Sequence, residues 1–149
     1  MLRLSKLTDY ATVILSFMAK NNKPVHAAIE IASATGIALP TVSKILKLLV
    51  NAHVLVSTRG AKGGYALASE PDKITVASVI SALEGPIALT ECSHTHHGCE
   101  QATGCGIRSN WSLINEAIQN ALESVTLADM IRPAAAPEEI MIPVASLYR

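Results

Sequence analysis

The segment LPTVSKILKLLVNAHVLVSTRGAKGGYALA, residues 39–68, decides the fold class. Its first half has apolar residues at helical spacing, and Pro40 suits the first turn of a helix. The expected buried face comprises Val42, Ile45, Leu46, Leu49 and Val50. Its second half has two short apolar runs, residues 54–56 and 65–67, on either side of RGAKGG. That pattern is typical of a β-hairpin, so the segment predicts a helix followed by a hairpin with a basic tip.

Two more helices are expected before this segment. Across residues 5–20 apolar side chains recur every three or four positions, which is typical of one face of an amphipathic helix. Residues 26–36 form an alanine-rich stretch that stops at Gly36, a residue suited to a left-handed helix cap. A short helix, a tight turn and a longer helix make a helix-turn-helix, and the following hairpin makes it a winged helix.

Residues after the hairpin predict a second functional region. A fourth helix is expected over residues 74–85, and a fifth over residues 110–122, with Trp111, Ile114, Ile118 and Leu122 along one side. The predicted fold is therefore mainly α, with a small β-hairpin wing and a C-terminal dimerisation helix. We expect a winged-helix DNA-binding domain (1–84), a cysteine-rich cluster-binding loop (85–109), a dimerisation helix region (110–131) and a flexible tail (132–149).

Composition and charge agree with that division. Half of the 149 residues are apolar but only five are aromatic, which favours an aliphatic helical core over a β-sandwich. Residues 1–70 carry eight lysines and arginines against three acids, or +5, whereas residues 71–149 carry four against nine, or −5. A basic front half indicates a polyanionic partner. No signal peptide or membrane span is evident, so we expect a cytoplasmic protein with no membrane partner.

The polar face of the third predicted helix is the candidate DNA-reading surface. Hydroxyl and ammonium groups there could meet base edges and phosphates in a major groove. The basic hairpin tip could enter a neighbouring minor groove or contact the backbone. The candidate DNA-binding residues are Thr41, Ser43, Lys44 and Lys47 on the helix and Arg59 and Lys62 on the hairpin. Each alone fits an ordinary solvated surface; together with the charge asymmetry they indicate double-stranded DNA.

A second candidate site is the segment TECSHTHHGCEQATGCGIRSNW, residues 90–111. It contains all three cysteines of the chain and three of its five histidines: Cys92, Cys99, Cys105, His94, His96 and His97. In a reducing compartment, clustered thiols more often mean metal or redox chemistry than disulfides. Thiolates favour iron–sulfur clusters, Zn²⁺ or Cu(I). Three cysteines leave a fourth position open, which a histidine could fill in a zinc site, although the usual C-x2-C spacing is missing. Unligated thiols remain an alternative.

These motifs together resemble the Rrf-type family of winged-helix transcription regulators, whose members include IscR, NsrR and the regulators of SUF iron–sulfur assembly operons. The resemblance covers the chain to about residue 132. It is carried by LRLSKLTDYATVIL, LPTVSKILKLLVNAHVLVSTRGAKGGYAL, VISALEGPIALTEC and the three-cysteine loop. The runs LTDYA, LPTVSK and ALEGP–TEC are most similar to the SUF-regulator branch.

The resemblance implies a homodimer that binds a palindromic operator and holds one iron–sulfur cluster per subunit, [2Fe-2S] or [4Fe-4S], through Cys92, Cys99 and Cys105. In IscR-like members a histidine three residues after the last cysteine is the fourth ligand; here that position is Arg108. In NsrR-like members it is an aspartate of the partner subunit's first helix, which matches Asp9 here. Asp9 could instead simply favour the helix N-terminus, and one of the loop histidines or a small exogenous ligand could complete the set.

The resulting hypothesis is an iron–sulfur-sensing repressor of iron–sulfur assembly genes, in which the cluster sets the affinity for the operator. One alternative is a zinc- or thiol-based repressor of the same fold that responds to redox change or nitric oxide. A more remote alternative is an enzyme with a Cys–His pair, but no orienting residue, oxyanion loop or substrate motif accompanies the pair. We therefore expect no enzymatic activity and no small-molecule substrate.

Overall fold

The first three helices form where the apolar spacing predicts them in the computed structural model, which describes residues 3–21, 23–91 and 104–133. They are α1 (Lys6–Lys20), α2 (Ala28–Thr35) and α3 (Leu39–Asn51). Ser5 caps α1, because its hydroxyl accepts a hydrogen bond from the amide of Thr8. Gly36 ends α2 in the left-handed conformation, with φ of 70°. The helix-turn-helix is thus confirmed.

One aliphatic core joins these helices. α1 contributes Ala11, Ile14, Leu15 and Met18, and α3 contributes Val42, Ile45, Leu46 and Leu49. Of the predicted α3 face only Val50 is half-buried, and it packs against the edge of the core. We call residues 5–84, which surround this core, the head.

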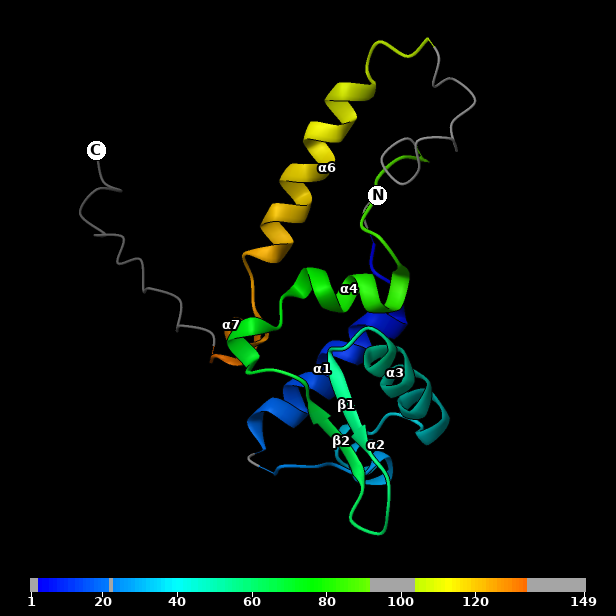
Figure 1. Ribbon diagram of the computed structural model, residues 1–149, viewed down its shortest axis with the longest axis vertical. Coiled ribbons are helices and arrows are strands. Elements are labelled where there is room, and N and C mark those ends of the chain that lie inside the picture. Colours follow the sequence, from blue (N-terminus) through cyan, green and yellow to red (C-terminus); the bar gives the residue numbers. More distant parts are fainter. Residues whose placement is uncertain (1–2, 22, 92–103, 134–149) are drawn as a thin grey trace, which may run out of the picture.

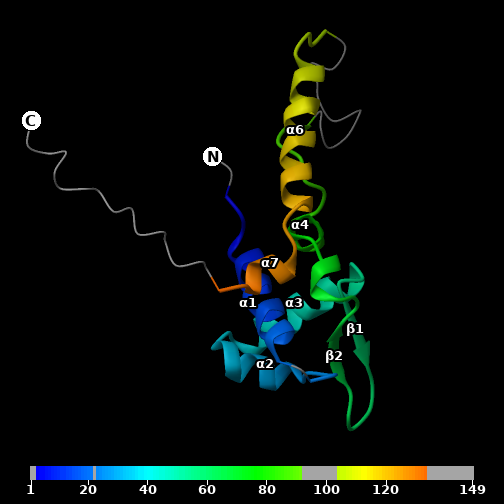
Figure 2. The same ribbon diagram turned by 90° about the vertical axis from the view of Figure 1, so that its left-hand side faces the viewer.

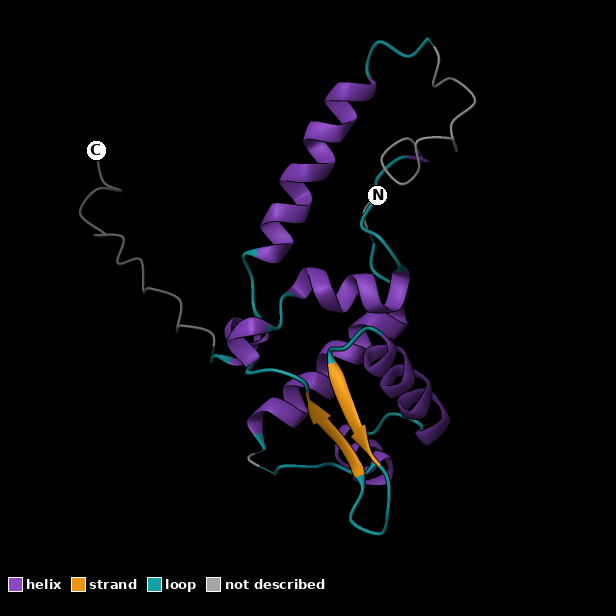
Figure 3. Ribbon diagram, in the orientation of Figure 1, coloured by secondary structure: helices purple, strands orange, loops and turns teal. Residues whose placement is uncertain are grey.

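The wing is a two-stranded antiparallel sheet, β1 (Leu55–Thr58) and β2 (Gly64–Leu67), joined by residues 59–63. Figure 3 shows it beside the helices. Residue 26, predicted to be helical, is extended instead: His26 and Tyr65 exchange two backbone hydrogen bonds of 2.8 and 2.9 Å. The helix therefore starts only at Ala28. Gly64 permits this approach, since a Cβ there would lie 2.5 Å from the carbonyl oxygen of His26.

After the wing come the 3-10 turn η1 (Pro71–Lys73) and α4 (Val76–Glu84), which is capped by Thr75 and ends at Gly85. α6 (Arg108–Glu123) then projects away from the head in both views (Figures 1 and 2). We call residues 108–123 the arm. None of its residues is buried.

The chain returns to the head through α7 (Leu127–Ile131), a short helix that the sequence analysis did not separate from the fifth helix. Leu127 is 4% exposed and belongs to the core. Backbone hydrogen bonds fix the return: the amide of Val76 donates to Val125 at 2.9 Å, and the amide of Leu127 donates to Ile74 at 2.8 Å. The C-terminal end of the arm is thus anchored to the head.

Within the described ranges, no single helix is long and apolar enough to cross a membrane. Only α2 and α3 taken together reach the required length and composition, and that pair is bent by 120°.

Candidate nucleic-acid interface and cysteine loop

The outer face of α3 presents the four predicted DNA-reading residues. Lys44 and Lys47 are exposed, and Thr41 and Ser43 are half-buried in the first turns of the helix. The opposite face is buried in the core, so the helix is held rigidly from behind. In the described part of the chain, neither lysine has a carboxylate within ion-pair distance. Both ammonium groups are therefore available to phosphates.

The wing tip carries the other two predicted contacts. Arg59 and Lys62 are exposed in the loop between β1 and β2, and no described acid pairs with either of them. The loop turns tightly: Gly60 has a φ of 114°, and its carbonyl accepts a hydrogen bond from Gly63 at 2.9 Å. The wing thus holds two free cations on a short, stiff hairpin.

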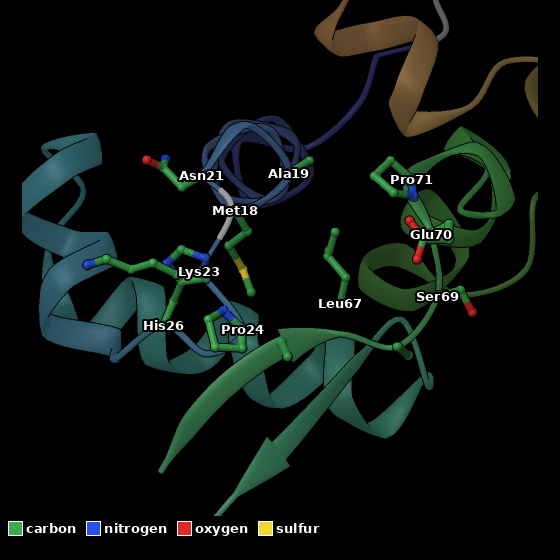
Figure 4. Close-up of a pocket in the computed structure, with 12 residues that line it drawn as sticks. Met18, Ala19, Asn21, Lys23, Pro24, His26, Leu67, Ser69, Glu70 and Pro71 are labelled. Carbon is green, nitrogen blue, oxygen red and sulfur yellow. The ribbon is translucent and has the colours of Figure 1, made fainter. Parts of the chain in front are cut away.

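Elsewhere on the described surface some cations are neutralised. Lys23 pairs with Glu30, and Arg132 pairs with Asp129. A hollow of about 380 Å³ lies between the end of α1 and the base of the wing. Its lining residues are drawn in Figure 4, where the Lys23 side chain extends away from the others. The Lys23 ammonium is already paired with Glu30, so this hollow offers no unpaired cation to an anionic partner.

The structure describes only part of the predicted metal-ligand set. Cys92, Cys99 and the histidines His94, His96 and His97 lie outside the described residues. Cys105 has a free, half-buried thiol just before α6. Asp9 is exposed in the first turn of α1, and its carboxylate contacts no described hydrogen-bond or ion-pair partner. No group of three His, Cys, Asp or Glu side chains gathers among residues 3–21, 23–91 and 104–133.

A residue that the sequence analysis missed holds the start of the cysteine loop. The Asn115 side chain, on α6, accepts a hydrogen bond from the amide of Leu89 at 3.1 Å and donates one to the carbonyl of Ile87 at 3.0 Å. The segment that leads into the loop therefore lies against the arm. An asparagine on a helix surface gives no sequence signal for such a long-range contact.

A second missed contact joins the residue just before the loop to α1. Glu84, the last residue of α4, accepts hydrogen bonds from the Thr8 hydroxyl and from the amide of Ser5. These bonds, that of Thr8 first, hold the pKa of the Glu84 carboxyl below its usual value. The turn that carries Asp9 is thereby fixed to the end of α4, from which the cysteine loop departs.

Comparison with known proteins places this geometry in a family. The family described as "Rrf2: Iron-dependent Transcriptional regulator" matches residues 4–133. The protein rrf2 of Nitratidesulfovibrio vulgaris is 32% identical over 135 residues, which are 90% of each chain. The solved structure of CymR, the global cysteine regulator of B. subtilis, has a TM-score of 0.66 and 33% identity, covering 88% of this chain and 97% of its own.

IscR of T. potens is also similar in structure, with a TM-score of 0.64, 29% identity and coverage of 99% of this chain and 97% of its own. These likenesses extend across the head, the wing and the arm rather than the helix-turn-helix alone. They confirm the winged-helix fold predicted from the sequence. The chain belongs to the Rrf2 family of transcriptional regulators.

Proposed function

We propose that this protein is a DNA-binding repressor of iron–sulfur assembly genes, and that an iron–sulfur cluster sets its affinity for the operator. One observation carries the DNA-binding part: exposed cations on two adjacent elements, α3 and the wing, have no ion-pair partner among the described residues. A rigid helix with free ammonium groups fits a major groove, and a short basic hairpin fits the neighbouring backbone or minor groove.

The regulator acts as a homodimer through the arm in this proposal. Leu113 and Ile114 of α6 are 66% and 45% exposed, which is costly for large apolar side chains in a lone chain. Beside them lies a groove of about 430 Å³ between α6, α4 and the N-terminal segment. Its apolar lining comprises Leu4, Ile80, Ile87, Ala88, Leu89, Ile118 and Leu122. A second arm covering this surface would pair two recognition helices for a palindromic operator.

Three thiolates are the donor set that fits an iron–sulfur cluster, so Cys92, Cys99 and Cys105 would hold it. Asp9 of the partner subunit is the candidate fourth ligand, since its carboxylate is exposed and uncommitted among the described residues. When bound, the cluster supplies a link between the thiolates that is sensitive to oxidation and iron supply. Contacts within the chain would transmit the change caused by cluster binding or loss. Glu84 holds the turn of Asp9 against α4, and Asn115 holds the start of the loop against the arm.

The test compares operator binding by protein purified without oxygen and by the same protein after chelation of iron. The operator fragment is obtained by selection from random duplexes. We expect the chelated protein to bind that fragment more weakly, and Cys99→Ser to behave like chelated protein. Equal affinity of the two forms would refute cluster control while leaving DNA binding intact.

The similar structure of CymR is that of the global cysteine regulator of B. subtilis, so this fold also serves regulation linked to cysteine rather than to iron. The second candidate is therefore a regulator of the same fold that responds through oxidation of its own thiols. Visible absorption of anaerobically purified protein separates the two candidates. A brown protein with iron and sulfide supports the cluster. A colourless protein whose operator affinity changes on thiol oxidation supports the alternative, which needs no metal.

A further inference from the structure

We propose that the hollow at the start of α1 binds a phosphate of the DNA backbone, with Lys6 as its cationic contact. This site extends the DNA interface beyond α3 and the wing to a third element. It rests on the proposed DNA-binding function, and the experiment below separates failure of this site from failure of that function.

The geometry places Lys6 next to the recognition helix. A hollow of about 410 Å³ is lined by Lys6 and Tyr10 of α1, by the turn at residues 36–38, and by Thr41 of α3. The Lys6 ammonium lies 5.3 Å from the centre of the Tyr10 ring, in range of a cation–π contact. The Tyr10 ring therefore steadies this cation beside a hollow that the turn between α2 and α3 and Thr41 also line.

The charge of Lys6 is free. No carboxylate in the described ranges lies within ion-pair distance of its ammonium. A phosphate in the hollow would meet this ammonium, with the Thr41 hydroxyl on the facing wall as a hydrogen-bond donor.

The position of Lys6 in α1 costs stability rather than adding to it. Lys6 is the first residue of the helix, where the helix dipole favours an acid and disfavours a cation. Residues that break a local rule without a structural gain are expected at functional sites. A phosphate would offset the unfavourable charge, so the ligand explains why a cation stands here.

The opposite end of α1 supplies the contrast. Its hollow, of about 380 Å³, is lined by Lys23 (Figure 4), and the Lys23 ammonium binds Glu30. His26 also lines this hollow, but its side chain is only 2% exposed, and its Nδ1 lies 3.9 Å from the same Glu30 carboxylate. Two hollows of similar size thus flank one helix, and only the one beside α3 offers a free cation.

The experiment measures the affinity of Lys6→Ala and wild-type protein for two duplexes, one of random sequence and one selected for tight binding, over a series of salt concentrations. Each lost phosphate contact lowers the magnitude of the slope of log affinity against log salt by about 0.9, so a homodimer, which loses one contact in each subunit, should show a decrease of about 1.8. Loss of the contact should also weaken binding to both duplexes by the same factor, because phosphates carry no sequence information. Lys6→Arg should bind as wild type does. Lys20→Ala, which removes the same charge from the other end of α1, should leave the slope unchanged.

Thermal unfolding separates a binding role from a structural one. Lys6→Ala should melt no lower than wild type, because it removes a cation from a helix N-terminus. A wild-type slope for Lys6→Ala, beside a reduced slope for Lys47→Ala, would overturn the phosphate site and leave the proposed function standing. Failure of Lys6→Arg to restore binding would also overturn it. If wild-type protein bound neither duplex, the proposed function and this site would fall together.

Discussion

The head and the arm contain helices of nearly equal length that are stabilised in opposite ways. α1 has 15 residues, five of them buried, whereas α6 has 16 residues and buries none. Isolated helices of this length are marginal in water, and most helical stability in proteins comes from packing of an apolar face. The head therefore supplies its own partner for α1. The apolar face of α6 needs a surface that a single chain offers only in part.

The largest expected effect tests whether stability resides in the head. Leu46 is fully buried in the core, so Leu46→Ala should lower the free energy of unfolding by about 3 kcal/mol through lost packing and a cavity. Leu113→Ala makes the same truncation on the exposed face of the arm, and should cost less than about 0.5 kcal/mol in the monomer. Urea unfolding of both variants at low protein concentration measures the difference. Equal losses would break the contrast between the two regions.

The next largest effect tests whether a second chain covers the apolar face of the arm in a dimer. Ile114→Glu places a charge on its apolar face, and should weaken self-association by at least about tenfold, which corresponds to about 1.4 kcal/mol. Sedimentation over a range of concentrations measures the dimer. Ser112→Glu adds the same charge to the exposed polar side of α6, and should leave the dimer intact. A dimer insensitive to Ile114→Glu would mean that the arm is not the interface.

The smallest expected effect concerns the capping box at the start of α7, where the chain returns from the arm to the head. The Thr126 hydroxyl accepts a hydrogen bond from the Asp129 amide, and the Asp129 carboxylate accepts one from the Thr126 amide at 3.0 Å. Thr126→Ala removes the hydroxyl bonds of this capping box but keeps the bond from the amide of residue 126, and should cost about 1 kcal/mol at neutral pH. Thr58→Ala, on the exposed wing, serves as the matched control.

The same capping box makes the loss depend on pH. Hydrogen bonds from the Thr126 amide, then from its hydroxyl, hold the pKa of the Asp129 carboxyl below its usual value, with Arg132 adding to the effect. Because the folded pKa is lowered, this contribution is complete above the unfolded pKa of about 3.9 and disappears as the pH falls through the folded value. The stability gap between wild type and Thr126→Ala should therefore narrow in acid. A gap that widens in acid would contradict this assignment.

The parts of the fold that the sequence predicts are those set by local sequence patterns. The bounds of α1 and α3 follow from helical periodicity, and Gly36 and Pro40 mark the turn between α2 and α3. By contrast, the extended backbone of His26 depends on pairing with Tyr65, a residue far along the chain. α7 has a local signal for its start, the capping box of Thr126 and Asp129, but its five residues are too few to show a helical period, and Leu127 is buried only because the head receives it.

The residues of the candidate site also divide into those that the sequence predicts and those that it does not. Exposure of Lys44, Lys47, Arg59 and Lys62 follows from the buried face of α3 and from the hairpin turn, so sequence reasoning found them. The role assigned to the cysteines stays a prediction, because Cys92 and Cys99 lie outside the described residues. The contacts of Glu84 and Asn115 could not be predicted, since each joins segments that become neighbours only after folding.

The two points at which the chain leaves and rejoins the head also bear on how such a protein can change over generations. The chain leaves the head at Gly85 and is bound to it again from Val125 onward. The described residues between these points contact α4 and the N-terminal segment but contribute no residue to the buried core, so we expect insertions and substitutions among them to leave the head able to fold. Mutation can thus replace the signal that a regulator answers while the genes under its control stay the same. Such a lineage would inherit its DNA sites and its sensory chemistry as separate traits.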